Sequence, residues 1–163
     1  MARKVFYSFH YQNDHWRVQQ VMKMGVIEGQ PLLSSQRWEE VQKAGKAAIE
    51  AWIAQQMKDK SVVVVLIGSE TSTRPWVRHE IIKAWNDGKG LLGVYIHGLK
   101  DEHGYASLKG KNPFDGVKMK DGTLMSKYVS VYEPIGSTSQ DKYDYIKRGL
   151  PNWVEAAYQK RNR

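Results

Sequence analysis

Residues 61–87 read SVVVVLIGSETSTRPWVRHEIIKAWND. The β-branched and apolar run over residues 61–67 has the length of a strand, and its unbroken apolar character is typical of a strand covered on both faces at the centre of a parallel α/β sheet. Pro75 suits the first turn of a helix, because its missing N–H would have no intrahelical partner there. We therefore expect a central strand, a polar loop after Gly68 and a helix that begins at Pro75.

Glu80 lies on this expected helix, close to the place where ligands bind in such folds. Open α/β sheets bind ligands outside the carboxyl ends of their strands, and the loop and the helix start both lie there. Trp76 and Glu80 are one helical turn apart, so both are expected at the rim of the crevice. The alternative is that Glu80 is a surface residue paired with Lys83, three positions further on.

The rest of the sequence alternates strand and helix patterns. Strand patterns occupy residues 4–9, 26–27, 90–97 and 128–132. Helix patterns occupy residues 15–24, 36–58, 142–148 and 152–158. The order β-α-β-α-β-α-β over the first part of the chain predicts a doubly wound parallel sheet with helices on both faces.

Single residues set the expected ends of these elements. Asp14 is a reasonable N-cap for the first helix, which leaves residues 10–14 as a loop after the first strand. Ser35 is available as the cap of the long second helix, which Gly45 weakens in its interior. Gly149 and Pro151 are expected to separate the last two helices.

A length of 163 residues and a hydrophobic content of 41% are those of one globular domain, over residues 1–163. Its core is expected over about residues 4–97, followed by a loop-rich insertion over about 98–127 and a C-terminal strand and helices over about 128–163. The glycine- and lysine-rich part of the insertion, residues 98–121, is longer than most loops of compact domains, which favours a functional or mobile segment.

The composition excludes several classes of protein. The absence of cysteine excludes disulfides, Cys-ligated zinc, Cys-held iron–sulfur clusters and a cysteine nucleophile. No apolar run approaches the roughly 20 residues of a membrane span, and the N-terminus shows no signal-peptide pattern. We therefore expect a cytoplasmic protein that does not enter a membrane.

The formal charge of +8 raises the question of a nucleic-acid partner. The basic residues are spread among acidic ones, apart from the tail over residues 160–163, and no nucleic-acid motif is present. This pattern favours a basic surface that attracts anionic ligands, such as a dinucleotide, over a dedicated nucleic-acid surface.

The named motifs of phosphate, metal and hydrolase sites are absent. The one G-x-G-x-x-G match, residues 88–93, leaves an expected helix and enters an expected strand, which is the reverse of the order that a phosphate cradle requires. The five histidines form no H-E-x-x-H pattern, and no G-x-S-x-G elbow occurs, so we expect neither a metal site nor a hydrolase serine.

A carboxylate among aromatic side chains is the remaining candidate site. Glu80 would share one rim with aromatic residues from several elements: Phe9, Tyr11, Trp38 and Trp76. Aromatic faces stack on nucleobases or nicotinamide, and a carboxylate can hold ribose hydroxyls or stabilise the oxocarbenium-like state that forms when a glycosidic bond breaks. The arrangement therefore permits cleavage of an N-ribosyl bond, although the aromatic residues could also be ordinary core.

Three stretches resemble the motifs of TIR domains: residues 5–9 with Asn13 and Asp14, the strand over residues 62–67 with Gly68 and Ser69, and Trp76-Val77-Arg78-His79-Glu80-Ile81. Together with Phe9-His10-Tyr11-Gln12, Arg74, Gly93 and Asn112-Pro113-Phe114-Asp115, they resemble more narrowly the TIR-like proteins of the bacterial Thoeris anti-phage defence system. The resemblance covers about residues 4–115.

The resemblance implies a flavodoxin-like fold and an enzyme that cleaves the nicotinamide–ribose bond of NAD. Glu80 matches the catalytic glutamate of that family. The substrate-binding positions implied by the same motifs are Phe9, His10, Tyr11, Asn13, Asp14, Trp38, Ser69 and Trp76. NAD would be the substrate, so no separate cofactor and no metal are expected.

Thoeris TIR proteins respond to phage infection by converting NAD to a cyclic ADP-ribose isomer that activates a separate effector. For this chain the resemblance therefore implies an effector that responds to the product, and a trigger derived from the phage. Two alternatives stay open. One is a non-catalytic TIR module that binds other proteins, and the other is a deoxyribosyltransferase-like nucleoside enzyme or a nucleic-acid binder.

Overall fold

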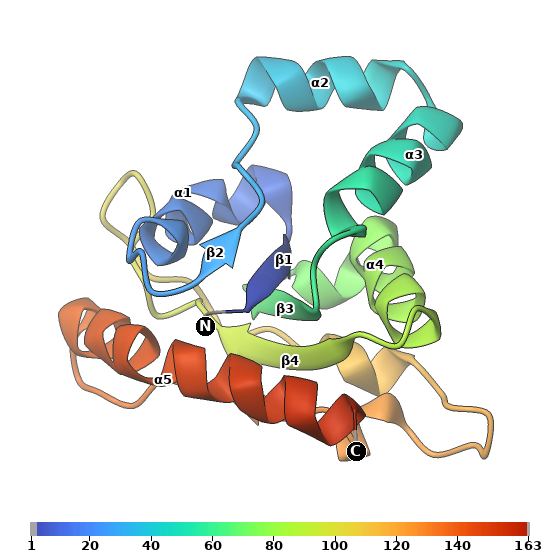
Figure 1. Ribbon diagram of the computed structural model, residues 1–163. Helices are drawn as coiled ribbons and strands as arrows, with labels where there is room; N and C mark the ends of the chain where they lie inside the picture. The colour runs from blue at the N-terminus through green and yellow to red at the C-terminus, as the bar shows by residue number, and fades with distance from the viewer. Residues whose placement is uncertain (1–2, 163) are drawn as a thin grey trace.

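A five-stranded parallel sheet forms the centre of the molecule, in the order β2-β1-β3-β4-β5. Figure 1 labels β1, β2, β3 and β4 of this sheet. A computed structural model describes residues 3–162. The strands are β1 (Lys4–Ser8), β2 (Glu28–Gly29), β3 (Val62–Ile67), β4 (Gly90–Tyr95) and β5 (Val131–Tyr132). This strand order is that of flavodoxin-like folds, so the predicted fold class is confirmed.

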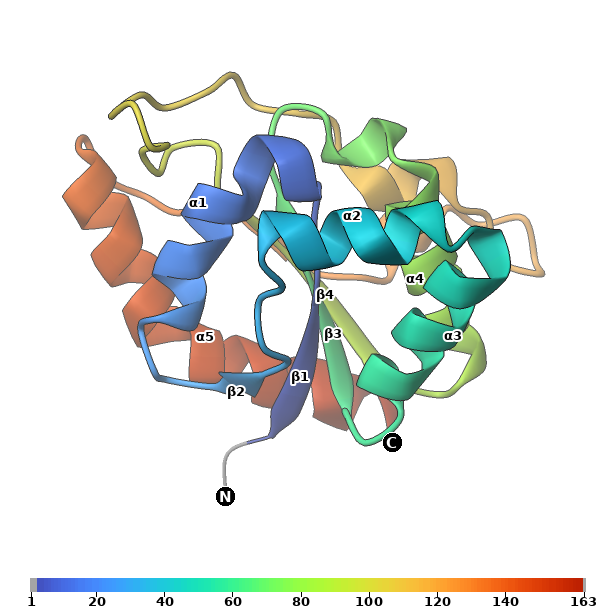
Figure 2. The same ribbon diagram turned by 90° about the horizontal axis from the view of Figure 1, so that it is seen from above.

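Helices cover both faces of the sheet (Figure 2). One face carries α1 (Tyr11–Met22) and α5 (Ser139–Arg161), and the other carries α3 (Lys46–Met57) and α4 (Pro75–Asn86). The short helix α2 (Ser35–Lys43) lies apart from the sheet and joins α3. The predicted helix beginning at Pro75 is confirmed.

Alternate residues of β3 supply two separate hydrophobic cores. Val63, Val65 and Ile67 belong to the core on the α3 and α4 side. Val62, Val64 and Leu66 belong to the core on the α1 and α5 side. Every residue of β3 and β4 is buried, as expected for central strands of a parallel sheet covered on both faces.

The first helix begins earlier than the sequence predicts. Its N-cap is His10, whose Nδ1 accepts a hydrogen bond from the N–H of Asn13 at 3.5 Å. Most of the predicted loop over residues 10–14 is therefore the first turn of α1. Asp14 is not the cap, because its side chain is buried beside Arg17 within the helix.

The predicted helix over residues 36–58 is two helices. The chain turns between α2 and α3 at Gly45, whose φ of +98° is open to glycine and strained for other residues. Ser34, one residue before the expected cap, accepts a hydrogen bond from the N–H of Arg37. The second strand also lies two residues later than predicted, at Glu28–Gly29.

The C-terminal segment is one helix, α5, where the sequence predicts two. Its buried residues Ile146, Leu150 and Val154 recur at a spacing of four, and this apolar stripe packs against the sheet through the predicted break. Gly149 is needed for packing inside the helix, because a Cβ there would lie 2.2 Å from the Trp153 ring. Packing on the sheet thus outweighs the local preference of Gly149 and Pro151 to end a helix.

The insertion after β4 crosses the carboxyl end of β3. At Gly110 a Cβ would lie 2.2 Å from the carbonyl oxygen of Gly68, so the two backbones are in close contact. Further along, two short 3-10 helices, Pro113–Gly116 and Met125–Lys127, bury Phe114 and Met125 in the core. The insertion is therefore packed against the sheet at both of these places.

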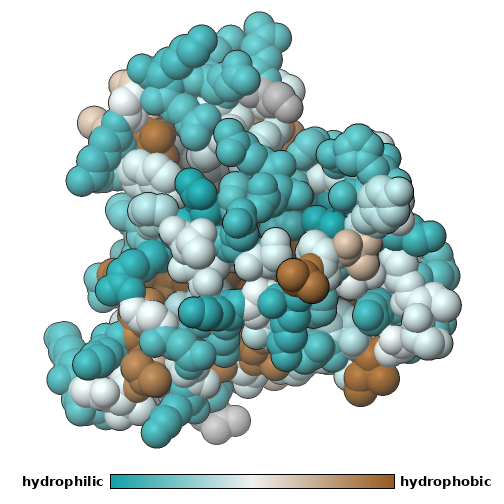
Figure 3. Space-filling view, turned by 180° about the vertical axis from the view of Figure 1, so that it is seen from behind, coloured by the Kyte–Doolittle hydropathy of each residue, from teal (hydrophilic) through white to brown (hydrophobic). Residues whose placement is uncertain are grey.

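One face of the molecule is largely polar (Figure 3). The face in Figure 3 is mostly hydrophilic, with hydrophobic residues exposed as separate spots. Within residues 3–162, no helix combines the length and the apolar character that crossing a bilayer would require.

Candidate functional site

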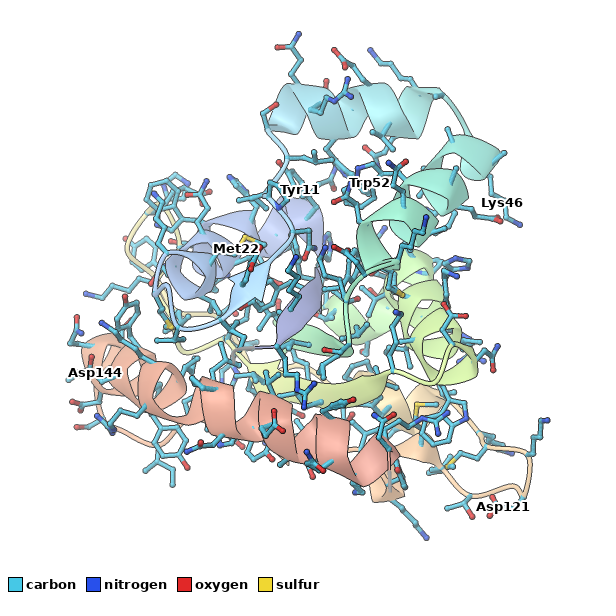
Figure 4. All side chains as sticks on the ribbon, in the orientation of Figure 1. Tyr11, Met22, Lys46, Trp52, Asp121 and Asp144 are labelled. Atoms are coloured by element: carbon cyan, nitrogen blue, oxygen red, sulfur yellow. The ribbon has the colours of Figure 1, made fainter. Side chains whose placement is uncertain are left out.

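A pocket of about 170 Å³ opens among the end of β1, the start of α1, the segment from β2 to α2, the helix α3 and the start of α4. Figure 4 shows Tyr11 of α1 and Trp52 of α3 below α2. The pocket is lined by six of the predicted site residues: Phe9, His10, Tyr11, Trp38, Trp76 and Glu80.

Glu80 is a buried member of this lining. Its side chain is only 7% exposed, and the Ser8 hydroxyl donates a hydrogen bond to Oε1 at 2.6 Å. Lys83 instead pairs with Asp87, with Nζ and Oδ2 at 2.9 Å. The alternative interpretation of Glu80 as a surface residue paired with Lys83 is therefore wrong.

Burial controls the charge of Glu80. Removal from water disfavours the carboxylate and raises the pKa of Glu80 to about 8, while the hydrogen bond from Ser8 acts in the opposite direction. Burial thus favours the protonated form of the side chain at neutral pH. A positive charge beside it would favour the anion, so a cationic ligand and ionised Glu80 stabilise each other.

Tyr11 is the middle ring of an aromatic wall. Its ring stacks on Phe9 at 6.0 Å and on Trp38 at 5.4 Å between centroids, and the Trp38 ring meets Trp52 edge to face at 6.1 Å. The Tyr11 hydroxyl also donates to the carbonyl of Leu33. The rings therefore fix the segment before α2, and α2 itself, across the opening of the pocket.

His10 and Arg74 are the nitrogen-containing ionisable side chains of the lining. Burial, with a further contribution from the nearby positive charge of Arg74, lowers the pKa of His10. Arg74 is exposed and occupies the N-cap position of α4, where no side chain accepts a hydrogen bond from the first turn. The pocket thus has a neutral histidine inside and a cation at its rim.

Three predicted site residues lie outside the lining. Asn13 donates from Nδ2 to Glu70 Oε2 at 2.7 Å on the surface, and Asp14 is buried with Arg17, Oδ1 to Nη1 at 3.1 Å. Ser69 lies where Gly110 packs, since a Cβ at Gly110 would be 2.8 Å from the Ser69 carbonyl oxygen. The insertion therefore covers the strand end that was expected to face the ligand.

Residues 6–101 match the family model described as Thoeris protein ThsB, TIR-like domain. This chain belongs to that family. A relative from Bacillus cereus (strain MSX-D12), named "Putative cyclic ADP-D-ribose synthase ThsB1", is 38% identical over 157 residues, which cover 88% of this chain and 77% of the relative. The resemblance drawn from the sequence motifs is confirmed.

Gln30, Trp52 and Arg74 line the pocket of this TIR-like domain, and Ser8 bonds Glu80 behind it, although none of the four was among the predicted site residues. Gln30 shows why such residues are hard to predict from the sequence. Its side-chain amide accepts from the N–H of Tyr7 and donates to the carbonyl of Tyr7, both at 2.8 Å, and so continues the pairing of β1 where the two-residue β2 ends. Nothing in the local pattern marks this role, whereas a serine on an inward strand position is a visible signal at Ser8.

The part of this TIR-like domain that the structure describes contains no group of three or more His, Cys, Asp or Glu side chains that could hold a metal ion. The pocket lining offers one buried carboxyl group, aromatic faces and hydrogen-bonding side chains.

Proposed function

We propose that this ThsB-family protein cleaves the nicotinamide–ribose bond of NAD and closes the ADP-ribose part into a cyclic isomer, with Glu80 as the catalytic residue. The observation that carries the proposal is the buried carboxyl group of Glu80 in an aromatic-lined pocket. The name of the Bacillus cereus relative, a cyclic ADP-D-ribose synthase, supports the same reaction.

The role of Glu80 follows from the charges that develop during the reaction. The bond from the anomeric carbon to the nicotinamide nitrogen breaks, and nicotinamide leaves with the bonding electrons. The ionised carboxylate holds the ribose hydroxyls and stabilises the positive charge on the anomeric carbon. An internal adenine nitrogen or hydroxyl then bonds to that carbon and loses its proton if it carries one, whereas attack by water gives linear ADP-ribose.

The pocket has room for one end of the dinucleotide. Its volume of about 170 Å³ is below the 300–1,000 Å³ typical of sites that enclose a drug-sized ligand. We therefore place the nicotinamide ribose beside Glu80 and Trp76, with the ring against the wall of Phe9, Tyr11 and Trp38. The diphosphate would lie at the rim beside Arg74, whose charge is complementary.

The remaining steps of the proposal follow the family. The cyclic product activates a separate effector, a phage-derived component triggers the reaction, and the protein acts in the cytoplasm. Asn13, Asp14 and Ser69 are retained only as positions that a closed, substrate-bound form could bring nearer. A module that binds other TIR domains without catalysis is the competing function, and it does not require an ionisable group at Glu80.

Mass spectrometry of nucleotide extracts from phage-infected cells tests this function. We expect a cyclic ADP-ribose species with the wild type and none with Glu80→Gln, which keeps the shape and removes the charge. Glu50→Gln, at the solvent-exposed ion pair with Lys46 on α3, is the matched control and should resemble the wild type. If Glu80→Gln protects cells fully while NAD stays constant in both strains, the catalytic proposal is wrong and the interaction module replaces it.

A further inference from the structure

Ser8 is a polar exception on an apolar face. It is the last residue of β1, and the period of two along a strand places it on the same side as Phe6, which belongs to the core under α3 and α4. Its side chain is 1% exposed. A buried hydroxyl at such a position needs a partner, and its partner is Glu80 Oε1.

The hydrogen bond from Ser8 is also distinctive among the contacts of Glu80. Across residues 3–162, Ser8 is the one side chain or backbone group that donates a hydrogen bond to this carboxyl group. The bond holds Oε1 and leaves Oε2 without a protein donor. The other ionisable side chains of the lining, none of which bonds Glu80, are Tyr7, His10, Tyr11 and Arg74.

We propose that Ser8 is a positioning residue, whose hydroxyl fixes Glu80 through Oε1 so that Oε2 is presented to the ribose of the substrate. The proposal rests on the proposed function and gives each carboxyl oxygen of Glu80 a separate role: Oε1 accepts from Ser8, and Oε2 contacts the substrate. β1 and α4 each carry one of the two side chains, so the contact also sets the distance between a strand end and a helix at the floor of the pocket.

Two substitutions separate positioning from simple packing. Ser8→Ala removes the hydroxyl with little change in volume, and Ser8→Thr retains the hydroxyl on a residue that suits a strand. Ser61→Ala is the matched control, because the Ser61 hydroxyl donates to the carbonyl of Lys4 at 3.4 Å at the opposite end of β1. Chemical unfolding of each full-length variant establishes that it is folded.

The first measurement is the titration of the Glu80 carboxyl carbon by ¹³C NMR, which requires no turnover. A donor to the carboxylate favours ionisation, so Ser8→Ala should move the midpoint to higher pH by about one unit. Ser8→Thr and Ser61→Ala should keep the wild-type midpoint. An unchanged midpoint in Ser8→Ala would show that the hydroxyl does not hold the carboxyl group in solution.

The second measurement is the cyclic nucleotide formed in infected cells at equal protein level. Ser8→Ala should form at least about tenfold less than the wild type, in line with the loss of one charge-assisted hydrogen bond, and Ser8→Thr should restore most of it. A Ser8→Ala protein as active as Ser61→Ala overturns the positioning role. Failure of the proposed function is a different result, in which the wild type itself forms no cyclic nucleotide.

Discussion

At the scale of single residues, the raised pKa of Glu80 makes the free energy of unfolding depend on pH. Its folded-state pKa of about 8 lies above the ordinary value of 4.5, so the stability that this group contributes is fully present below pH 4.5 and is lost as the pH rises through 8. We predict that Glu80→Gln is close to the wild type near pH 5 and more stable at pH 9, by up to about 5 kcal/mol. Urea unfolding at the two pH values measures this difference.

The control for this experiment is Glu50→Gln, which removes an exposed carboxylate from a surface ion pair and should leave the stability close to that of the wild type. A stability difference between the wild type and Glu80→Gln that is the same at pH 5 and pH 9 would contradict the raised pKa.

The sequence motif singled out Glu80, but only the fold explains its protonation. Burial at the floor of the pocket and the contact with Ser8, 72 positions away in the sequence, are tertiary features.

At the scale of elements, α2 depends on a glycine hinge and an aromatic stack. None of its described side chains is buried, and it joins α3 through Gly45 at a φ of +98°. A Cβ at Gly45 would meet nothing within 4 Å, so the cost of Gly45→Ala is backbone strain alone. We predict a loss of about 1–3 kcal/mol in the free energy of unfolding, measured in urea.

Gly116→Ala is the comparison for the hinge, since Gly116 has no positive φ and a Cβ there would only touch Arg78 at 3.7 Å. It should be neutral or slightly stabilising. Equal losses in the two variants would show that strain at Gly45 is not the cause.

The break at Gly45 could not be predicted from periodicity, because apolar residues recur at helical spacing on both sides of it. Equally, α5 continues through Pro151 because Leu150 and Val154 pack on the sheet.

At the scale of the whole molecule, the alternation of strands and helices was sufficient to predict the parallel sheet and its two helical layers. It also predicted the rim at the carboxyl ends of the strands, but not which strand ends along that rim border the pocket. Both the predicted loop at Ser69 and the observed pocket lie beyond carboxyl ends of strands, and the insertion decides between them by packing Gly110 against Gly68. Contacts of this kind join distant segments and leave no local pattern in the sequence.

Arg17 anchors the insertion to the rest of the molecule. It is 4% exposed, donates to the carbonyls of Leu99 and Tyr105 at 2.9 Å each, and pairs with the buried Asp14. Arg17→Met should free residues 99–105 and leave the Asp14 charge unpaired, for a loss of about 3–5 kcal/mol.

Hydrogen exchange followed by mass spectrometry distinguishes the two effects of Arg17→Met. We predict faster exchange over residues 99–110, while β4 stays protected because its pairing with β3 is untouched. Adding Asp14→Asn should recover part of the stability, since it removes the unpaired charge, but it should not slow exchange in the insertion. Arg37→Met removes an exposed arginine that pairs with Glu40 and should change neither quantity. If the insertion exchanges at the wild-type rate in Arg17→Met, then backbone packing at Gly110 is enough to hold it, and the insertion covers the end of β3 independently of α1.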